Sequence, residues 1–563
     1  MHQVRRLTLF ALLLPAIALA QTARPLKHTP RPTVPAISAG DLETRLYIFA
    51  DDSMQGRDVG AIGNLKATEY IAREARRIGL VPAGDSGTYF QTVPVKTRSF
   101  DTATSTFTVA GASLTPFVDY LPIAREPLDN PVLPIVYGGE VCDAAHALPP
   151  EQASGKFVVA TVPSGFSGRC GPHSAPPPKG AAAAALIALD GFPRQFFVFF
   201  RDRRPFLDDP AASRVVPVFL IGSGAAAKMF SVPPDQLRLG MAGATAAVGV
   251  RYDVQPLPYA ARNVVAIVPG SDPRLKGEYV VIGAHSDHIG VVPRPVDHDS
   301  VRIWNHIVRP EGDDDDQKQA TAELQAQVNT ALAAFRATHP GAARSDSINN
   351  GADDDGSGSV ALLEIAERIA SLQRKPKRSI LFVWHTGEER GYFGSRFFTD
   401  HPTVPRDSIV AELQLDMVGR GGAEDETGRT RDGVPRHGGP SYLQLVGSRR
   451  VSTELGDLIE RVNSAGRHNL AFDYAIDADG NPSQLYCRSD QYEYARFGIP
   501  VTFFTTGLHS DYHQVSDEPQ YIDYTHMARV AILVEDVAVH VADLDHRVVV
   551  NHPKPEPDAP CSQ

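Results

Sequence analysis

The chain of 563 residues is too long for a single hydrophobic core, so its length predicts two or three domains. Hydrophobic residues make up 42% and charged residues 21%, which is the composition of an ordinary globular protein. The formal charge of -11 leaves no surplus of basic residues to displace counterions from phosphates, and this argues against a nucleic-acid partner.

Residues 1–20 have the pattern of a secretory signal peptide. Arg5 and Arg6 precede an apolar run, which ends in the small residues Ala18 and Ala20, so we expect cleavage after Ala20. A membrane anchor is the weaker interpretation, because the apolar run is short and the polar, proline-rich linker 21–38 follows it. We expect a secreted or periplasmic protein with no membrane span in its mature form.

The four cysteines suit an oxidising compartment, where even numbers usually pair. Three pairings are possible, and we favour Cys142–Cys170 with Cys487–Cys561. The first pair would lie within one proposed domain, and the second would tie the C-terminal tail to its neighbour. The spacing of the cysteines matches no thiolate metal site.

Residues 39–80 are predicted to form two helices. Asp41 is expected to cap the first helix, and the second places Leu65 and Ile78 near one apolar face before it ends at Gly79. From about residue 90 to residue 260 the pattern changes.

This middle segment favours short strands, separated by turns rich in proline and glycine. Strands are expected near 157–162 and 215–221, and an alanine-rich helix over Gly180–Leu189. The segment contains no His, Asp or Glu cluster with ligand spacing, so we expect it to cover or bind rather than to catalyse.

From Asn263 onward, predicted strands and helices alternate, which is typical of an α/β domain with a largely parallel or mixed sheet. The predicted strands are 263–268, 279–284, 379–384, 409–415 and 500–504, and the predicted helices are 358–372, 453–465 and 524–541.

Polar clusters follow these strands or begin a helix: 285–288, 353–355, 388–389, 416 and 509–513. Each alone has an ordinary explanation as a helix cap, a hydrogen-bonded histidine or a solvated carboxylate pair. The loops at the carboxyl ends of such strands line a common crevice. The repeated occurrence of polar clusters in these loops therefore predicts that they form one shared site. Histidine and carboxylate ligands without thiolate suit zinc, and also cobalt or manganese.

The strings GAHSDH, GADDDGSG, TGEERGYFGS, LDMVG and DYHQVSDE resemble, in order, the motifs of the co-catalytic di-zinc aminopeptidase family. That family includes secreted bacterial leucyl aminopeptidases, aminopeptidase Y and relatives of glutamate carboxypeptidase II. The resemblance implies a three-layer α/β/α zinc-exopeptidase domain with a mostly parallel mixed sheet. The β-rich segment resembles, more loosely, a protease-associated domain.

Together these observations predict a division of the chain. The parts are a signal peptide (1–20), a linker (21–38), the N-terminal part of the peptidase domain (39–125), a protease-associated-like insert (126–255), the catalytic domain (256–545, with an insertion at 291–350) and a tail (546–563).

The resemblance also implies two zinc ions per chain, for which cobalt or manganese could substitute. By position, His285 and Asp416 would hold one ion, Glu389 and His513 the other, and Asp354 would bridge them.

Three further residues receive roles from the same motifs. Asp287 would orient His285 through its other ring nitrogen. Glu388 would act as general base, taking a proton from the attacking water and passing it to the leaving amine. Tyr512 resembles the tyrosine that supports the oxyanion in some relatives, with a packed aromatic ring as the alternative.

The insertion at 291–350 departs from the family pattern, in which the bridging aspartate soon follows the first histidine. It contains Trp304, the acidic run Asp313–Asp316 and a helix with Leu324 and Phe335 on one face. Because it is rooted between two expected ligands, we expect it to cap or narrow the substrate entrance.

The favoured activity is therefore aminopeptidase action on peptide substrates. A carboxypeptidase or dipeptidase acting on acidic peptides is the first alternative, but no arginine-rich run accompanies the motifs. A single-zinc glutaminyl cyclase or an inactive binding protein would lack ligands or the base, and this chain retains Glu388 and all five expected ligands.

Overall fold

The computed structural model describes residues 25–124, 126–141, 143, 147–163, 177–211, 216–315, 320–339, 344–557, 559 and 561–563. The predicted signal peptide, Cys142, Cys170 and Asp316 lie outside these residues. In the described part of the chain, no helix has both the length and the apolar character needed to cross a membrane.

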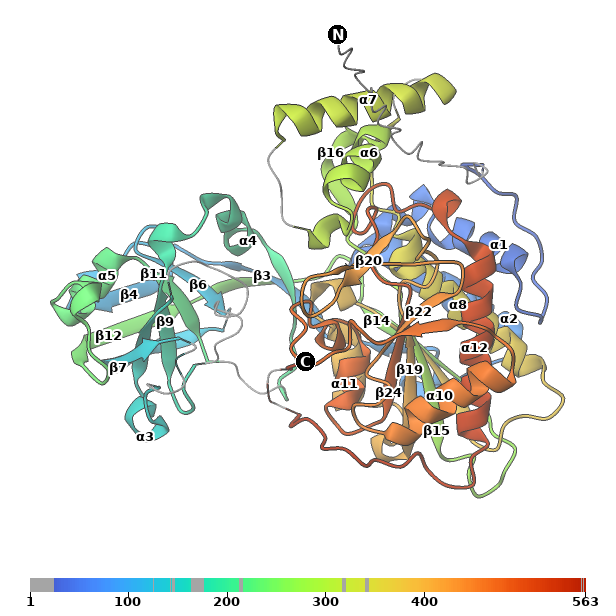
Figure 1. Cartoon of the computed structure of the whole chain (residues 1–563). Helices are drawn as coiled ribbons and strands as arrows, with labels where there is room; N and C mark the ends of the chain where they lie inside the picture. Colours follow the sequence, from blue (N-terminus) through green and yellow to red (C-terminus); the bar gives the residue numbers. More distant parts are fainter. Residues whose placement is uncertain are drawn as a thin grey trace, which may run out of the picture.

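Figure 1 shows two bodies side by side, each built on its own sheet. The larger body has a nine-stranded sheet. Its strands, in spatial order, are β1 (Val81–Pro82), β14 (Arg262–Val268), β18 (Ser379–His385), β15 (Tyr279–His285), β19 (Ile409–Leu415), β24 (Val501–Thr505), β22 (Tyr442–Val446) and β23 (Ala471–Asp473), with β2 (Phe90–Thr92) beside β14.

The centre of this sheet is parallel, and its flanks are antiparallel. Strands β18, β15, β19 and β24 run in one direction, whereas β14 pairs antiparallel with β18 and β22 pairs antiparallel with β24. The carboxyl ends of the four central strands therefore lie along the same edge. The mixed α/β fold predicted from the sequence is confirmed.

Helices cover both faces of the larger sheet. The main apolar core joins one face to α1 (Ala39–Phe49), α2 (Ile62–Ile78), α8 (Gly358–Ser371), α10 (Thr453–Ala465) and α12 (Tyr524–Ala542). The opposite face packs against α9 (Phe393–Asp400) and α11 (Gln491–Ala495). All seven residues of β18, and all residues of β15 except Tyr279, are buried, and most of their side chains on both faces of the sheet are apolar.

The smaller body has an eight-stranded sheet and a separate core around Phe107, Phe157 and Phe219. Its strands, in spatial order, are β5 (Ala112–Ser113), β4 (Thr106–Val109), β12 (Ala242–Val250), β7 (Leu128–Glu140), β8 (Phe157–Thr161), β9 (Ala183–Ile187), β11 (Val218–Ile221) and β6 (Tyr120–Ala124). Because β4, β5 and β6 belong to this sheet, we propose that the unit begins before residue 126, the boundary expected from sequence.

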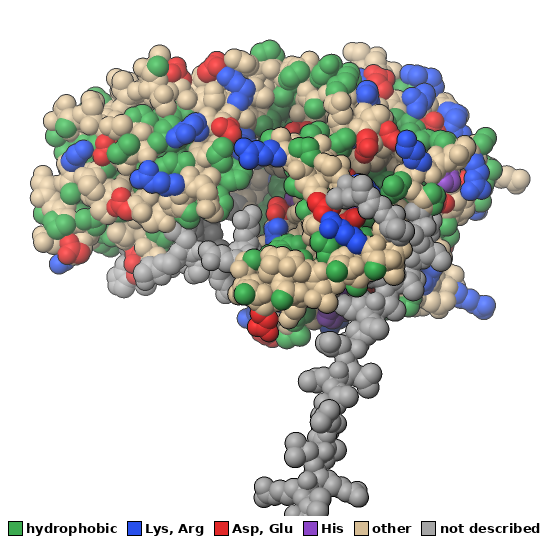
Figure 2. Space-filling view, turned by 90° about the horizontal axis from the view of Figure 1, so that it is seen from above, with side chains coloured by type: hydrophobic (Ala, Val, Ile, Leu, Met, Phe, Trp, Pro, Cys, Tyr) green, Lys and Arg blue, Asp and Glu red, His purple; other side chains and the backbone are tan. Residues whose placement is uncertain are grey.

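A three-stranded ribbon of β10 (Arg204–Leu207), β3 (Val95–Phe100) and β13 (Tyr252–Pro256) leads from the smaller body to the larger one. Short helices α3 (Pro150–Ala153), α4 (Phe197–Arg201) and α5 (Ser223–Phe230) complete the smaller body. On the face seen in Figure 2, basic and acidic side chains are interspersed.

Two local predictions were wrong. Residues Gly180–Leu189 contain the strand β9 instead of a helix, because this segment pairs in parallel with β8 and β11, where small buried alanines fit between the neighbours. Tertiary context thus overrides the helix propensity of alanine. Asp41 does not cap α1: Ser38 is the N-cap, and its hydroxyl accepts the backbone N–H of Asp41.

The insertion leaves the larger body on an antiparallel hairpin of β16 (Val291–Asp297) and β17 (Ser345–Ile348). Helices α6 (His298–Val308) and α7 (Ala322–Thr338) lie above the main body in Figure 1. At the other end of the chain, Cys487 and Cys561 form the predicted disulfide bond.

Candidate metal centre

Five side chains from five chain segments converge at one edge of the larger sheet. His285 ends β15, Asp416 directly follows β19, and Glu389 lies in the turn after β18. Asp354 lies in the turn before α8, and His513 in the loop after β24. These are the residues expected from sequence to bind metal, and parallel pairing of the central strands places them together.

The five side chains form two groups that share one carboxylate. In the first group, His285 Nε2 lies 3.1 Å from Asp354 Oδ1 and 3.6 Å from Asp416 Oδ1. In the second group, His513 Nε2 lies 3.0 Å from Asp354 Oδ2 and 3.0 Å from Glu389 Oε2. Each oxygen of Asp354 therefore faces a different group, which is the placement that a bridging ligand requires.

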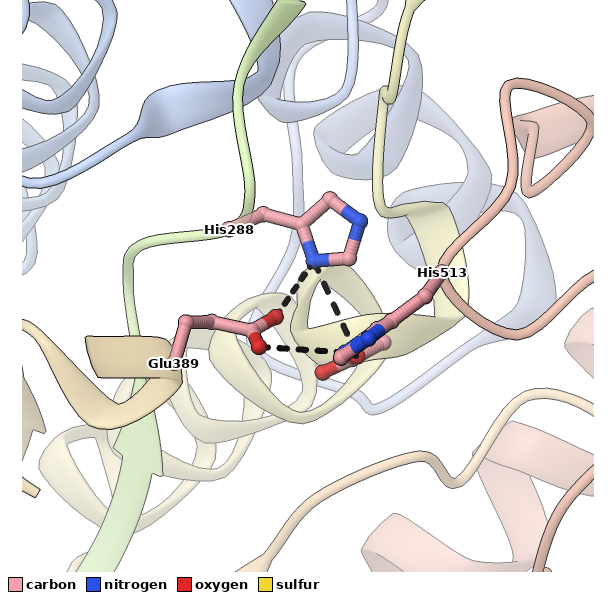
Figure 3. A group of neighbouring side chains, drawn as sticks. His288, Glu389 and His513 are labelled. Atoms are coloured by element: carbon pink, nitrogen blue, oxygen red, sulfur yellow. Dashed lines mark hydrogen bonds and ion pairs between the residues drawn. The ribbon is translucent and has the colours of Figure 1, made fainter. Parts of the chain in front are cut away.

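His288 is a member of the second group that the sequence analysis did not assign. Its Nδ1 lies 2.7 Å from Glu389 Oε1 and 3.7 Å from Asp354 Oδ2 (Figure 3). Its ring is buried against Gly351, where an added Cβ would come within 2.5 Å of the ring. The sequence feature that could have identified His288 as a site residue is its position in the same polar cluster, 285–288, as His285.

The donor set fits metal ions. Candidate ligand atoms within each group lie within 4.8 Å of one another, and all are nitrogen or carboxylate oxygen. Asp416 Oδ1 is buried without a hydrogen-bond partner, as is His288 Nε2. Buried carboxylates crowded around imidazoles are stabilised by a cation, and this mixture of ligands suits zinc.

The two adjacent glutamates have pKa values displaced in opposite directions. Burial raises the pKa of Glu388 well above its ordinary value, and the charges of Glu389 and Asp416 add to the rise. Burial also acts to raise the pKa of Glu389, but His513 and His288 outweigh it and lower that pKa to about 2. Two adjacent carboxylates thus have different environments, as the separate roles predicted for them require.

Asp287 lies between Glu388 and His285 of the first group. Its Oδ1 accepts the backbone N–H of Glu388 at 3.2 Å and lies 3.7 Å from His285 Nδ1. The closer oxygen to His285 Nδ1 is the main-chain carbonyl of Asp287, at 3.2 Å. The Asp287 carboxylate thus lies beyond hydrogen-bond distance of the His285 ring that it was expected to orient, and the main-chain carbonyl makes the shorter contact. The hydrogen bond from Glu388 to this carboxylate was not expected from the sequence.

The turn that carries Asp354 is held by two distant residues that the sequence analysis did not assign. The Arg57 guanidinium, fully buried, donates to the carbonyl oxygens of Asn350 at 2.5 Å and Gly351 at 2.8 Å. Asp517 accepts the backbone N–H of Asp354 at 3.1 Å. These bonds hold the main chain of the turn that carries Asp354.

A cavity opens on this centre. Its floor contains Asp354, Glu388, Glu389 and Asp416. Its walls are formed by Met417, Leu485, Arg488, Phe503, Thr505, Gly507, Leu508 and Tyr512. The Tyr512 ring stacks on His513 with centroids 4.0 Å apart, and burial raises the pKa of its hydroxyl, which therefore stays a hydrogen-bond donor.

A mixed α/β fold with paired histidine and carboxylate groups at the carboxyl edge of its sheet is the architecture of a metallohydrolase. Residues 263–538 match peptidase family M28, which identifies this segment as a peptidase domain of that family. The matched residues include all the side chains of the metal centre. They do not include the smaller body, whose likeness to a protease-associated domain stays a prediction.

Individual relatives match over shorter stretches. Leucine aminopeptidase 1 of Sclerotinia sclerotiorum is 27% identical over 204 residues, which are 34% of this chain and 47% of the relative. Leupeptin-inactivating enzyme 1 of Streptomyces exfoliatus is 35% identical over 77 residues, 13% of this chain and 18% of the relative. The chain thus spans about half the length, or less, of these curated relatives.

Among solved structures, the aminopeptidase from Aneurinibacillus sp. strain AM-1 aligns with a TM-score of 0.45 and 16% identity, covering 92% of this chain and 97% of that one. BSAP, a zinc aminopeptidase from Bacillus subtilis, aligns with a TM-score of 0.43 and 14% identity, covering 90% and 96%.

Proposed function

We propose that the chain is a secreted, zinc-dependent aminopeptidase that removes N-terminal residues from peptides. The observation that carries this proposal is the carboxylate of Asp354, whose two oxygens face two separate groups of histidine and carboxylate donors. Two metal ions joined by one carboxylate are typical of hydrolases that use a co-catalytic pair. Membership of a peptidase family supports peptides as the substrates.

His285 and Asp416 would hold one zinc ion, Glu389 and His513 the other, and Asp354 both; His288 stands beside Glu389. The same donors suit cobalt or manganese. When bound, such a pair polarises the scissile carbonyl and lowers the pKa of the attacking water.

Glu388 is the proposed general base. It belongs to the cavity floor, and its Oε2 lies 4.0 Å from His285 Nε2, beyond hydrogen-bond distance, so its carboxylate remains free for proton transfer. Its raised pKa brings the carboxyl closer to the range in which it can take a proton from water and return it to the leaving amine. Tyr512, in the cavity wall, is placed to donate a hydrogen bond to the developing oxyanion.

Export is supported by the signal-peptide pattern of residues 1–20 and by the Cys487–Cys561 disulfide. A second candidate activity, dipeptidase or carboxypeptidase action, is favoured by one observation. Arg488 lines the cavity, and its guanidinium could hold a substrate carboxylate in place of its ion pair with Asp314.

The test is hydrolysis of aminoacyl p-nitroanilides, free and N-acetylated, together with metal analysis. We expect activity only on free N-termini, loss with a chelator and recovery with zinc. Inactivity on the free anilides by a folded protein that holds two zinc ions would overturn the aminopeptidase assignment. Hydrolysis of C-terminal acidic dipeptides by the same sample would then identify the second candidate activity.

A further inference from the structure

The wall of the cavity is mostly apolar, with one exception. Met417, Leu485, Phe503 and Leu508 provide aliphatic and aromatic surface beside the metal centre. Among the described residues that line the cavity, Arg488 is the one with a cationic side chain. A single guanidinium in such a wall is positioned to influence which substrates enter.

Arg488 is held close to the catalytic centre by its neighbours in the chain. The adjacent Cys487 is in the disulfide, and the hydroxyl of the next residue, Ser489, donates to Asp416 Oδ2 at 2.7 Å. Burial acts to lower the pKa of Arg488, but Tyr512 and Asp314 outweigh this effect and raise the pKa, so the guanidinium stays charged. Its position and charge are thus both fixed.

The partner of this guanidinium comes from the insertion. Arg488 Nη2 lies 2.7 Å from Asp314 Oδ1, and the two side chains are 31% and 23% exposed, respectively. Since the pair is only partly exposed, solvent screens it less than a fully exposed pair. Asp314 therefore neutralises the one cationic side chain of the wall.

The turn that carries Asp314 is fixed against the loop of the second metal group. The backbone N–H of Asp313 donates to the carbonyl of Tyr512 at 3.2 Å. Gly312 has φ +62°, and an added Cβ would come within 2.6 Å of the same carbonyl oxygen. The close approach and the left-handed backbone both require glycine here. Asp314 is thus positioned by backbone contacts as well as by its ion pair.

We propose that Asp314 determines substrate specificity by occupying Arg488 and so excluding substrates that carry a carboxylate beside the scissile bond. This inference rests on the proposed peptidase function. With the pair intact, the wall offers a substrate an apolar surface without net charge. Without the Asp314 carboxylate, Arg488 would be free to bind a substrate carboxylate. That carboxylate is either the side chain of an acidic N-terminal residue or the C-terminus of a dipeptide.

The test compares D314N with the wild type on two pairs of substrates. Leucyl and glutamyl p-nitroanilide report on an acidic side chain, and Leu-Leu and Leu-Leu-amide report on a C-terminal carboxylate. We expect D314N to improve kcat/KM for the carboxylate-bearing member relative to its partner by about fivefold, the factor that corresponds to the upper range for an exposed ion pair. The substrate pair that responds identifies the source of the carboxylate.

Two further variants make the result specific. R488Q should shift the same ratio in the opposite direction, because it leaves the Asp314 carboxylate unpaired near the cavity. D297N removes an aspartate of the same insertion that pairs with Arg336 on α7, and it should leave both ratios unchanged. Zinc content and melting temperature verify that each variant is folded.

The inference would be overturned if the kcat/KM ratios of folded D314N and R488Q equal those of the wild type. It would also be overturned if D297N changes these ratios as much as D314N does. These outcomes require an active wild type, so they leave the aminopeptidase assignment in place. A wild type that cleaves no free N-terminus contradicts the proposed function instead. In that case, the affinity of each variant for acetate is compared with that of the wild type, by calorimetry or by inhibition of any remaining hydrolysis. Affinities of D314N and R488Q equal to that of the wild type would still overturn the inference.

Discussion

Glu388 and Glu389 are adjacent in the chain, yet their carboxylates face different halves of the metal centre. Glu388 Oε2 lies 4.0 Å from His285 Nε2, whereas Glu389 Oε2 lies 3.0 Å from His513 Nε2. Successive residues of the turn after β18 thus present one carboxylate to each group. This separation allows one residue to bind metal while its neighbour transfers protons.

The first prediction concerns these two glutamates. E388Q should lower kcat by about 10²–10⁴-fold, because the amide cannot accept the proton of water, while zinc binding stays near wild type. E389Q should instead lower the zinc content, since it removes a proposed ligand. Steady-state kinetics and metal analysis of both variants distinguish the roles. Equal zinc loss in the two variants would contradict the division.

The second prediction concerns His288. H288A should weaken zinc binding by about tenfold or more, because it removes a partner that orients Glu389 or contacts the metal itself. Competition with a chromogenic chelator measures the affinity. The matched control is H401A, which removes an exposed histidine that pairs with the largely buried Asp209 carboxylate, away from the metal centre. Equal zinc affinity in H288A and the wild type would show that His288 has only a packing role.

The sequence located most of the candidate site because its residues follow strands that are parallel neighbours. His285 and Asp416 end up together because β15 pairs directly with β19. His288 was missed because the direction of its ring depends on the loop after β15, which has no periodic pattern.

Other features depended on contacts that are distant in the sequence. Arg57 reaches the Asp354 turn from almost 300 residues earlier, and Asp314 reaches Arg488 from the insertion. No local signal predicts either contact. The strand β9 shows the same limit within the fold, because its alanine-rich sequence favours a helix and only its neighbours β8 and β11 make it a strand.

The third prediction concerns stability in acid. Burial lowers the pKa of His385 from its ordinary 6.5 to about 3, with the charge of His285 contributing in the same direction. Between these values the unfolded chain binds one more proton at this residue than the folded chain, so stability rises with pH and is lost as pH falls.

H385Q removes this proton while retaining an acceptor near the Tyr494 hydroxyl, which lies 3.1 Å from His385 Nε2. The dependence of the unfolding free energy on pH between about 3 and 6.5 should therefore become shallower by up to one proton. Denaturant unfolding at a series of pH values measures this slope. An unchanged slope would mean that His385 is not buried in its neutral form.

The last prediction follows from the way the insertion joins the loop of His513. Arg302 on α6 lies over the Tyr521 ring at 3.8 Å, and its Nε is 3.4 Å from the buried Asp511 carboxylate. Asp511 also accepts from Arg420 at 2.9 Å and belongs to the loop that carries His513. Through Arg302, the insertion is therefore part of the support for the loop that carries a proposed metal ligand.

R302M should lower the free energy of unfolding by about 1–3 kcal/mol, because it leaves Asp511 with fewer charged partners in a buried site. It should also weaken zinc binding, since the Asp511 loop holds His513. R336M, which removes the exposed arginine that pairs with Asp297 in the same insertion, should change neither quantity measurably. If R302M and R336M behave alike in unfolding and zinc titration, the insertion does not support the metal centre through Arg302.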